Sequence, residues 1–191
     1  MTDTLDTRTT ALLVMDHQQM LVNGYLADAP AHLARAREVI AKARAADMPV
    51  IYIKVGFRPG YPEVSPRNMM FSGVKAAGRF AHGDPSAEIA SEIAPAEGDL
   101  VVVKHRVSAF EGTDLAMILR AAKVETLVMF GIATSGVVLS TVRQGADLDY
   151  RMIVLADLCA DNDKAVHSFL IDTLLPRQAT VQSSAEFLAS L

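Results

Sequence analysis

Two charged residues in the sequence each follow an apolar run directly, as residues at the carboxyl ends of buried strands do. Asp16 comes after Ala11–Met15, and Lys104 comes after Leu100–Val103. An apolar wall beneath a carboxylate shifts its pKa, while a nearby ammonium group keeps the carboxylate charged. If the two side chains meet, they predict a site that transfers protons and orients an anionic ligand. The alternative is an ion pair with only a structural role.

A glycine-bounded loop, residues 131–136 (Gly-Ile-Ala-Thr-Ser-Gly), follows a third apolar run and leads into a helical pattern. Backbone N–H groups at the start of such a helix attract an anion or a developing oxyanion. Val137 and Val138 come next, so the loop lacks the Lys-Ser/Thr ending of a phosphate-binding loop and the three-glycine dinucleotide fingerprint. Nucleotide binding is therefore disfavoured, and a simple tight turn is the alternative to a site.

These candidates need a scaffold that brings their segments to one edge of a sheet. Short apolar runs alternate with helical patterns, which is typical of βαβ units in an α/β fold. We predict six strands buried on both faces, with the first and fourth side by side at the centre of a parallel sheet and the ligand beyond their carboxyl ends. The predicted strands are Ala11–Met15, Val50–Val55, Leu100–Val103, Thr126–Phe130, Met152–Leu155 and Ala179–Val181. Asp157, after the fifth run, is a further polar residue expected at this edge.

The stretches between the strands predict helices and one long loop. The predicted helices are Ala31–Ala46, Ser86–Glu92, Asp114–Ala122, Gly136–Asp147, Lys164–Leu175 and Ala185–Leu191. Residues 56–83 are rich in glycine and proline and predict a loop without secondary structure. Loops of this length usually have a function, so we expect a lid or a subunit contact, with a plain surface excursion as the alternative.

Composition limits the class of protein. The chain has 191 residues, 51% of them hydrophobic, with 18 basic and 22 acidic side chains, a net charge of −4 and one cysteine, Cys159. This length suits one domain that needs no disulfide, and one cysteine excludes an intrachain bridge and a multi-cysteine zinc site. The polar start of the chain lacks a secretory pattern, and no apolar run is long enough to cross a membrane. We therefore expect a cytoplasmic protein that binds a small molecule, with no nucleic-acid or membrane partner.

Three motifs together resemble the isochorismatase-like hydrolase superfamily. They are Leu12–Gln18 (Leu-Leu-Val-Met-Asp-His-Gln), Val102–Leu115 (containing Lys104) and Gly131–Arg143 (containing the glycine-bounded loop). The resemblance spans nearly the whole chain. It implies one domain over residues 1–191, a three-layer α/β/α sandwich around a six-stranded parallel, Rossmann-like sheet, and a homo-oligomer, either a dimer or a tetramer.

The resemblance also implies functional residues. Asp16 and Lys104 correspond to the family's catalytic Asp and Lys, and the implied binding residues are Phe110, Ile132, Ala133, Thr134, Ser135, Gly136 and Val137. It further implies a cis peptide bond at Ile132–Ala133. The metal ligands of metal-dependent members would fall in residues 53–58, which contain no histidine, so we expect neither a metal nor another cofactor.

Val137 stands where the amidase members of the superfamily carry their nucleophilic cysteine. A valine has no atom that can attack a carbonyl, so the thioester route is closed to this chain. Cys159 lies on another element, and a lone cysteine beside a buried run is more often inert. Ser135 and Ser140 lie close by in sequence, but neither has an evident histidine base. We expect backbone capping from these serines.

Two hypotheses of function remain. The isochorismatase branch implies hydrolysis of a vinyl ether without a cysteine, with Asp16 as the general acid and Lys104 holding an anionic group. In this reading the chain is a hydrolase that uses water as its nucleophile. The alternative is a protein that keeps the pocket to bind a metabolite, or serves as a subunit, after losing the chemistry.

Overall fold

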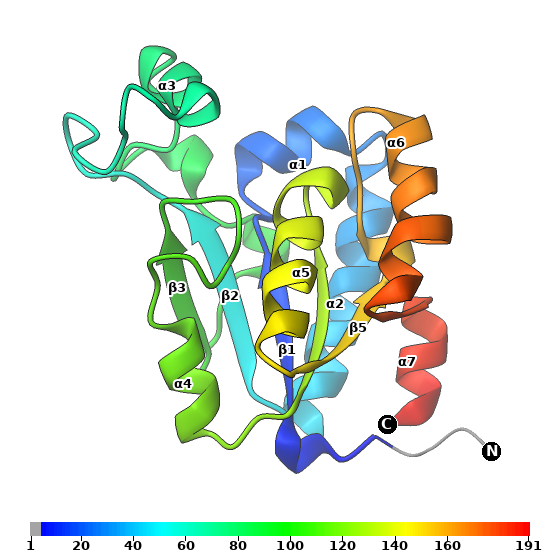
Figure 1. The fold of residues 1–191 in the computed structure, drawn as a ribbon. Helices are drawn as coiled ribbons and strands as arrows, with labels where there is room; N and C mark the ends of the chain where they lie inside the picture. Colours follow the sequence, from blue (N-terminus) through cyan, green and yellow to red (C-terminus); the bar gives the residue numbers. More distant parts are fainter. Residues whose placement is uncertain (1–4) are drawn as a thin grey trace.

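The computed structural model describes residues 5–191. Its centre is a six-stranded sheet in the order β3-β2-β1-β4-β5-β6, and every neighbouring pair of strands is parallel (Figure 1). The strands are β1 (Thr10–Met15), β2 (Val50–Val55), β3 (Leu100–Lys104), β4 (Thr126–Gly131), β5 (Arg151–Leu155) and β6 (Thr180–Gln182). The six predicted strands and the central position of the first and fourth are confirmed.

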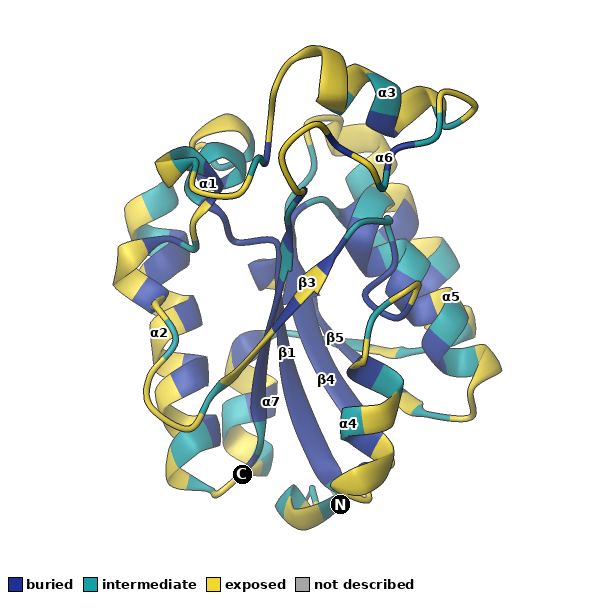
Figure 2. Cartoon of the chain, turned by 90° about the vertical axis from the view of Figure 1, so that its left-hand side faces the viewer, coloured by how far each residue is buried: buried dark blue, intermediate teal, exposed yellow. Residues whose placement is uncertain are grey.

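The apolar runs form strands because both of their faces are covered in the middle of the sheet. Every residue of β1 and β4 is buried, and these two strands pair along their full lengths, from Thr10 opposite Thr126 to Met15 opposite Gly131. Figure 2 shows the buried strands between layers of helices. Burial on both faces is the arrangement that favours a continuous apolar sequence over an alternating one.

Helices cover both faces of the sheet, which confirms the three-layer α/β/α prediction. In Figure 2, α2 and α7 lie on one side of the sheet, and α4, α5 and α6 lie on the other. The helices are α1 (Gln19–Tyr25), α2 (Ala29–Ala45), α3 (Met69–Ala76), α4 (Leu115–Ala121), α5 (Leu139–Asp147), α6 (Lys164–Phe169) and α7 (Ser184–Ser190). No helix within residues 5–191 is long and apolar enough to span a membrane.

Local sequence explains where the helices begin. The Asp28 side chain accepts a hydrogen bond from the Ala31 N–H at 3.1 Å at the start of α2, and Pro30 occupies its first turn. Ser183 and Glu186 form a reciprocal capping box at the start of α7. Both helices lie within two residues of the predicted bounds.

One predicted helix is wrong. Residues 86–92 do not form a helix but two 3-10 turns, Pro85–Ala87 and Ser91–Ile93, with an extended stretch between them. The stretch is extended because its backbone pairs with residues 17–19: Gln19 N–H donates to the Glu88 carbonyl and Ala90 N–H to the His17 carbonyl. The predicted helices at residues 136–147 and 164–175 are each partly π-helical, at Thr134–Val138 and Leu170–Leu174.

The segment 56–83 differs from the structureless loop that was predicted. It contains α3, whose first turn is capped by the Asn68 side chain accepting from the Phe71 N–H. Phe57, Phe71 and Phe80 form a small apolar cluster of their own beneath this helix. The segment thus packs against itself and extends beyond the carboxyl end of the sheet (Figure 1).

The expectation that all strands are covered on both faces is wrong for the two edge strands: no residue of β6 is buried, and β3 is largely exposed. Leu100, Val101 and Val103 are 44%, 45% and 43% exposed. The reason is position, because β3 is the last strand on its side of the sheet.

Candidate functional site

The carboxyl ends of β1 and β3 bring Asp16 and Lys104 together, although β2 lies between the two strands. Lys104 Nζ lies 2.9 Å from Asp16 Oδ2, and the two side chains are only 2% and 5% exposed. Asp16 adopts a left-handed backbone conformation, with φ 55°, at the point where the chain leaves β1. Its N–H donates to the Ile53 carbonyl at 2.8 Å, which fixes the turn against β2.

The electrostatics of this pair are set by burial. Loss of solvent raises the pKa of the Asp16 carboxyl above its usual value, and the Lys104 ammonium opposes that shift. Lys104 Nζ also donates to the Arg106 carbonyl at 3.1 Å. Asp16 Oδ1 is buried and has no hydrogen-bond partner among the described residues. An unpartnered carboxyl oxygen in such a place can hold or transfer a proton.

Asp16 and Lys104 line a cavity of about 620 Å³ at the edge of the sheet. Four of the binding residues implied by the resemblance line it as well: Ile132, Ala133, Gly136 and Val137. Most of the remaining wall is apolar and comes from α1 and the segment 56–83. A cavity of this size and character suits a small molecule held by a few polar groups.

The structure does not bring Phe110, Thr134 and Ser135 into the cavity wall. Phe110 is buried against Tyr150, with ring centroids 5.8 Å apart. Thr134 Oγ1 lies 2.8 Å from His167 Nδ1, and the Ser135 N–H donates to Asp161 Oδ2 at 2.7 Å. The resemblance implied these three residues from their positions in the motifs, and a position in a motif does not specify the direction of a side chain.

The backbone N–H groups expected to receive an anion are largely occupied. Thr134 N–H donates to the Ala160 carbonyl, and the N–H groups of Gly136 and Val138 both donate to the Ala133 carbonyl. With Ser135 also bonded, four N–H groups of this turn are satisfied within the protein. The structure therefore differs from the expected anion-binding helix start.

Val137 is 2% exposed and lines the cavity at the position where the resemblance implies a nucleophile. It packs close to Gly131, where an added Cβ would lie 3.2 Å from the Val137 side chain. The peptide bond between Ile132 and Ala133 is cis, as the resemblance implies. The site thus has a valine side chain at the position where the resemblance implies a nucleophilic sulfur atom.

Sequence reasoning missed the part of the cavity wall that α1 and the segment 56–83 supply. Tyr25, Met70, Phe71 and Phe80 provide apolar surface, and Arg79 provides an exposed cation. No periodic pattern marks these residues. The available signal was the length of the segment, which already indicated a lid or a subunit contact.

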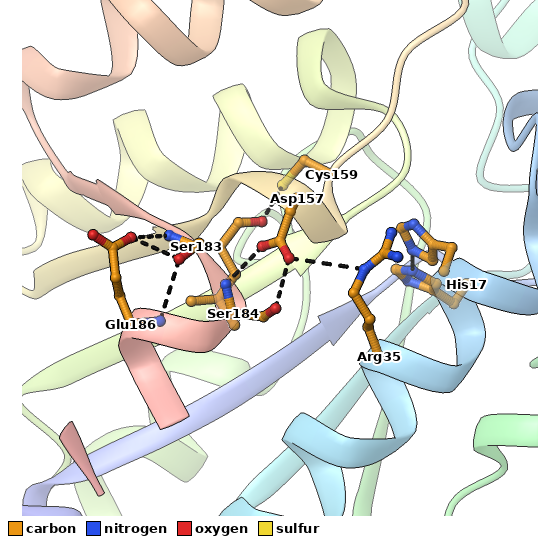
Figure 3. Close-up of polar contacts among 9 residues, drawn as sticks. His17, Arg35, Asp157, Cys159, Ser183, Ser184 and Glu186 are labelled. Carbon is orange, nitrogen blue, oxygen red and sulfur yellow. Dashed lines mark hydrogen bonds and ion pairs between the residues drawn. The ribbon is translucent and has the colours of Figure 1, made fainter. Parts of the chain in front are cut away.

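Asp157 is not a cavity residue, although it follows β5. Its carboxylate accepts from the Ser184 N–H at 2.7 Å and from Ser184 Oγ at 2.6 Å, and it lies 3.8 Å from Arg35 Nε (Figure 3). These contacts join the end of β5 to α7 and α2. The role of Asp157 in this structure is to hold two helices on the same face of the sheet.

Cys159 lies away from the cavity wall. It is buried, and its thiol contacts the Leu155 carbonyl at 3.4 Å. Burial raises the pKa of this thiol to about 12, so the reactive thiolate is scarce at neutral pH. Within residues 5–191, no three His, Cys, Asp or Glu side chains are arranged to hold a metal ion.

Comparisons with known proteins identify relatives of this chain. A family model described as the isochorismatase domain matches residues 10–186. The chain is 30% identical over 190 residues to the uncharacterized isochorismatase family protein YecD of Escherichia coli O157:H7, with 98% of each chain covered. It is 37% identical over 169 residues to the ureidoacrylate amidohydrolase RutB of Stutzerimonas stutzeri, covering 78% of this chain and 68% of that protein. It also resembles the crystal structure of N-carbamoylsarcosine amidase from Thermoplasma acidophilum, with a TM-score of 0.74, 32% identity, and 92% and 96% of the two chains covered.

Proposed function

The chain belongs to the isochorismatase family, and from this premise we propose that it is a hydrolase acting on a small molecule with water as the nucleophile. In this proposal Asp16 transfers the proton and Lys104 stabilises charge, without a covalent intermediate. The observation that carries the proposal is the buried Asp16–Lys104 ion pair in a cavity whose wall also contains Val137.

The raised pKa of Asp16 supports a general-acid step. A protonated Asp16 donates its proton to the methylene carbon of a vinyl ether, and the C=C electron pair forms the new C–H bond. Water adds to the resulting oxocarbenium ion and returns a proton to the Asp16 carboxylate. The hemiketal then collapses to a ketone and an alcohol, so one water is consumed and the enzyme is unchanged.

Lys104 suits the second half of this cycle. When Asp16 gives up its proton, it becomes a buried carboxylate, which is costly without a nearby positive charge. Lys104 Nζ, at 2.9 Å, provides that charge without moving. The pair can therefore pass between its two protonation states while both side chains stay almost fully buried.

The amidase names of two relatives do not transfer to this chain through the thioester route. The resemblance implies a cysteine nucleophile for such amidases, and Val137 cannot supply one. Direct attack by water on a polarised bond avoids this requirement. We therefore propose the vinyl-ether type of hydrolysis ahead of amide hydrolysis.

Arg79 supports an anionic substrate. Its side chain lies at the wall of the cavity, is exposed, and can donate two parallel hydrogen bonds to a carboxylate. The apolar surface from Tyr25 and Phe71 suits the body of a small organic acid. A carboxylated vinyl ether combines these features.

A hydrolase screen of the wild-type protein tests the proposal, with carboxylated vinyl ethers, esters and carboxamides compared in parallel. We expect turnover of at least one vinyl ether or ester, with no dependence on thiol reagents. Binding of these compounds without any turnover would favour the metabolite-binding alternative and contradict the proposed reaction.

A further inference from the structure

The backbone of β1 turns away from β2 before β2 ends. The last residues paired in this ladder are Met15 and Ile53, and the Asp16 N–H then donates to the Ile53 carbonyl at 2.8 Å. At Asp16 the chain leaves the strand, whereas β2 continues to Val55. Alternate residues of a strand direct their backbone groups to the same side, so Val55 directs its N–H and C=O toward β1, as Ile53 does. The backbone groups of Val55 therefore need partners that β1 no longer provides.

The side chain of Gln18 provides both of these partners. Gln18 Oε1 accepts from the Val55 N–H at 2.9 Å, and Gln18 Nε2 donates to the Val55 carbonyl at 2.9 Å. Gln18 is fully buried, where a backbone group without a partner is costly. Helix α1 begins at the next residue, but the Gln18 side chain does not cap it. The amide is thus committed to the end of β2.

The same amide also holds the far end of the segment that walls the cavity. Gln18 Nε2 donates to the Ala87 carbonyl as well. The segment 56–83 begins directly after Val55 and ends shortly before Ala87. It supplies most of the apolar cavity wall, including Phe71. One buried side chain therefore fixes both ends of the segment beside β1.

Val55 also connects Gln18 to Lys104. Val55 lies opposite Lys104 in the ladder between β2 and β3, and the Gly56 N–H donates to the Lys104 carbonyl at 3.2 Å. Hydrogen bonds thus run from Gln18, two residues after Asp16, across the end of β2 to Lys104. Because β2 lies between β1 and β3 (Figure 1), a shift of its end changes the distance between the two charged side chains.

A glutamine is the side chain that these contacts require. Its amide has two N–H donors, which meet the carbonyls of Val55 and Ala87, and one C=O, which meets the Val55 N–H. A glutamate of the same size has no donor when ionised, so both carbonyls would face a carboxylate. The amide also carries no net charge, so it holds the backbone without adding a charge to the buried site.

We propose that Gln18 is a positioning residue, which holds the end of β2 and both ends of the segment 56–83 so that Asp16 and Lys104 stay in contact. Gln18 is not a residue of the cavity wall, so it acts through the backbone and does not touch the substrate. The effect on catalysis rests on the proposed function. The effects on the segment and on the ion pair do not, and they can be measured without a substrate.

Hydrogen exchange of Gln18→Met tests the hold on the segment. Methionine has a similar length but makes none of the three hydrogen bonds. Thr141→Val is the matched control, because Thr141 is also fully buried, accepts from the Ala109 N–H at 3.1 Å and does not line the cavity. Backbone amides of residues 56–83 should exchange at least about tenfold faster in Gln18→Met than in Thr141→Val, while those of β4 stay protected in both. Equal exchange of residues 56–83 in the two variants would overturn the proposal.

The pKa of the Asp16 carboxyl tests the effect on the ion pair. Lys104 lowers this pKa against the stronger effect of burial, so a looser contact lets the pKa rise further. Carbon-13 NMR of the aspartate side chains measures it in the protein without ligand. We expect a rise of at least about 0.5 in Gln18→Met and no change in Thr141→Val. An unchanged or lowered pKa in folded Gln18→Met would show that Gln18 supports the fold without positioning the pair.

Turnover of the substrate found in the screen gives the third measurement. At a temperature where both variants are folded, Gln18→Met should lower kcat by at least about tenfold, and Thr141→Val should keep kcat within about twofold of the wild type. An equal kcat in the two variants would contradict a positioning role in the reaction. If the screen yields no substrate, the proposed hydrolase function fails, while the exchange rates and the pKa of Asp16 still decide whether Gln18 positions the pair.

Discussion

Lys104 Nζ and Asp16 Oδ2 lie 2.9 Å apart in the wall of a largely apolar cavity, and both side chains are almost fully buried. A buried ion pair contributes little net stability, because desolvation offsets the attraction. Removing one partner, however, leaves a buried charge without compensation. A buried ion pair that adds little stability, and whose disruption destabilises the protein, is typical of a site where charge moves during a reaction.

Asp16→Asn should abolish turnover of the substrate found in the screen while changing ligand affinity by less than about tenfold. The amide keeps the size and polarity of the carboxyl but cannot donate an acidic proton. Steady-state rates and calorimetric binding measure the two effects separately. Asp47→Asn is the matched control, because Asp47 has a similar left-handed conformation, with φ 53°, and lies outside the cavity wall. Wild-type turnover by Asp16→Asn would exclude Asp16 as the acid.

Val137→Cys should introduce thiol-dependent hydrolysis of short carboxamides. The substitution places a sulfur atom in the cavity wall near the Asp16–Lys104 pair, which can accept the thiol proton. Ammonia release, and its loss after alkylation of the thiol, measures the activity. Val138→Cys is the control, because Val138 is fully buried and does not line the cavity. If folded Val137→Cys releases no ammonia, the pocket has diverged from the amidases in more than its nucleophile.

Arg79→Ala should raise KM for a carboxylated substrate by about tenfold and leave kcat nearly unchanged, because the proposal assigns Arg79 to the anionic end of the substrate and not to the reacting bond. Arg79→Lys should recover part of the affinity through its charge. Arg58→Ala is the control, since Arg58 is paired with Glu63 at 2.7 Å and does not line this cavity. An unchanged KM in Arg79→Ala would remove Arg79 from substrate recognition.

The strand pattern was predictable because burial on both faces leaves a direct mark on the sequence. Asp16 and Lys104 were predictable for the same reason, since a charge directly after an apolar run must lie at the sheet edge. Their mutual contact was not predictable from spacing, because β2 separates their strands and only the length of Lys104 closes the gap.

The cavity wall formed by α3 could not be predicted in the same way. α3 has only eight residues, and Phe71 is its one buried side chain, so its apolar pattern is too short to read as a helix. Ser135 shows a second limit. Its N–H is bonded to Asp161, a contact across 26 positions that no local pattern reveals.

Gly131→Ala should destabilise the fold by about 1–3 kcal/mol, because an added methyl group overpacks the contact between the two central strands. A Cβ at this position would lie 2.9 Å from both the Cβ and the carbonyl oxygen of Met15. Gly73→Ala is the control: it lies in α3 with nothing within 4 Å of the added atom, and should be neutral or slightly stabilising. Urea denaturation measures both, and equal stability of the two variants would contradict the close packing of β1 and β4.

The buried pair His17 and His32 should make the protein sensitive to acid. Their Nε2 atoms lie 2.9 Å apart, and His17 Nδ1 lies 3.1 Å from the Met15 carbonyl. His17 is drawn as sticks and labelled in Figure 3. Since Nδ1 must donate to that carbonyl, Nε2 of His17 accepts and Nε2 of His32 donates. The His17 ring is therefore neutral, and protonating it would place two donors face to face.

Burial lowers the pKa of His17 to about 3 and that of His32 to about 4, from 6.5. Between pH 6.5 and these values the unfolded chain binds protons that the folded chain does not, so the free energy of unfolding falls as pH falls. The slope is at most about 1.4 kcal/mol per pH unit for each histidine; it is about half of that at pH 6.5 and nearly gone by about pH 7.5. His32→Gln keeps a donor for His17 and should lower the number of protons taken up on unfolding by about one, which makes the slope shallower. Urea titrations at several pH values measure the slope, and the same slope in wild type and His32→Gln would show that His32 is not the neutral buried group described here.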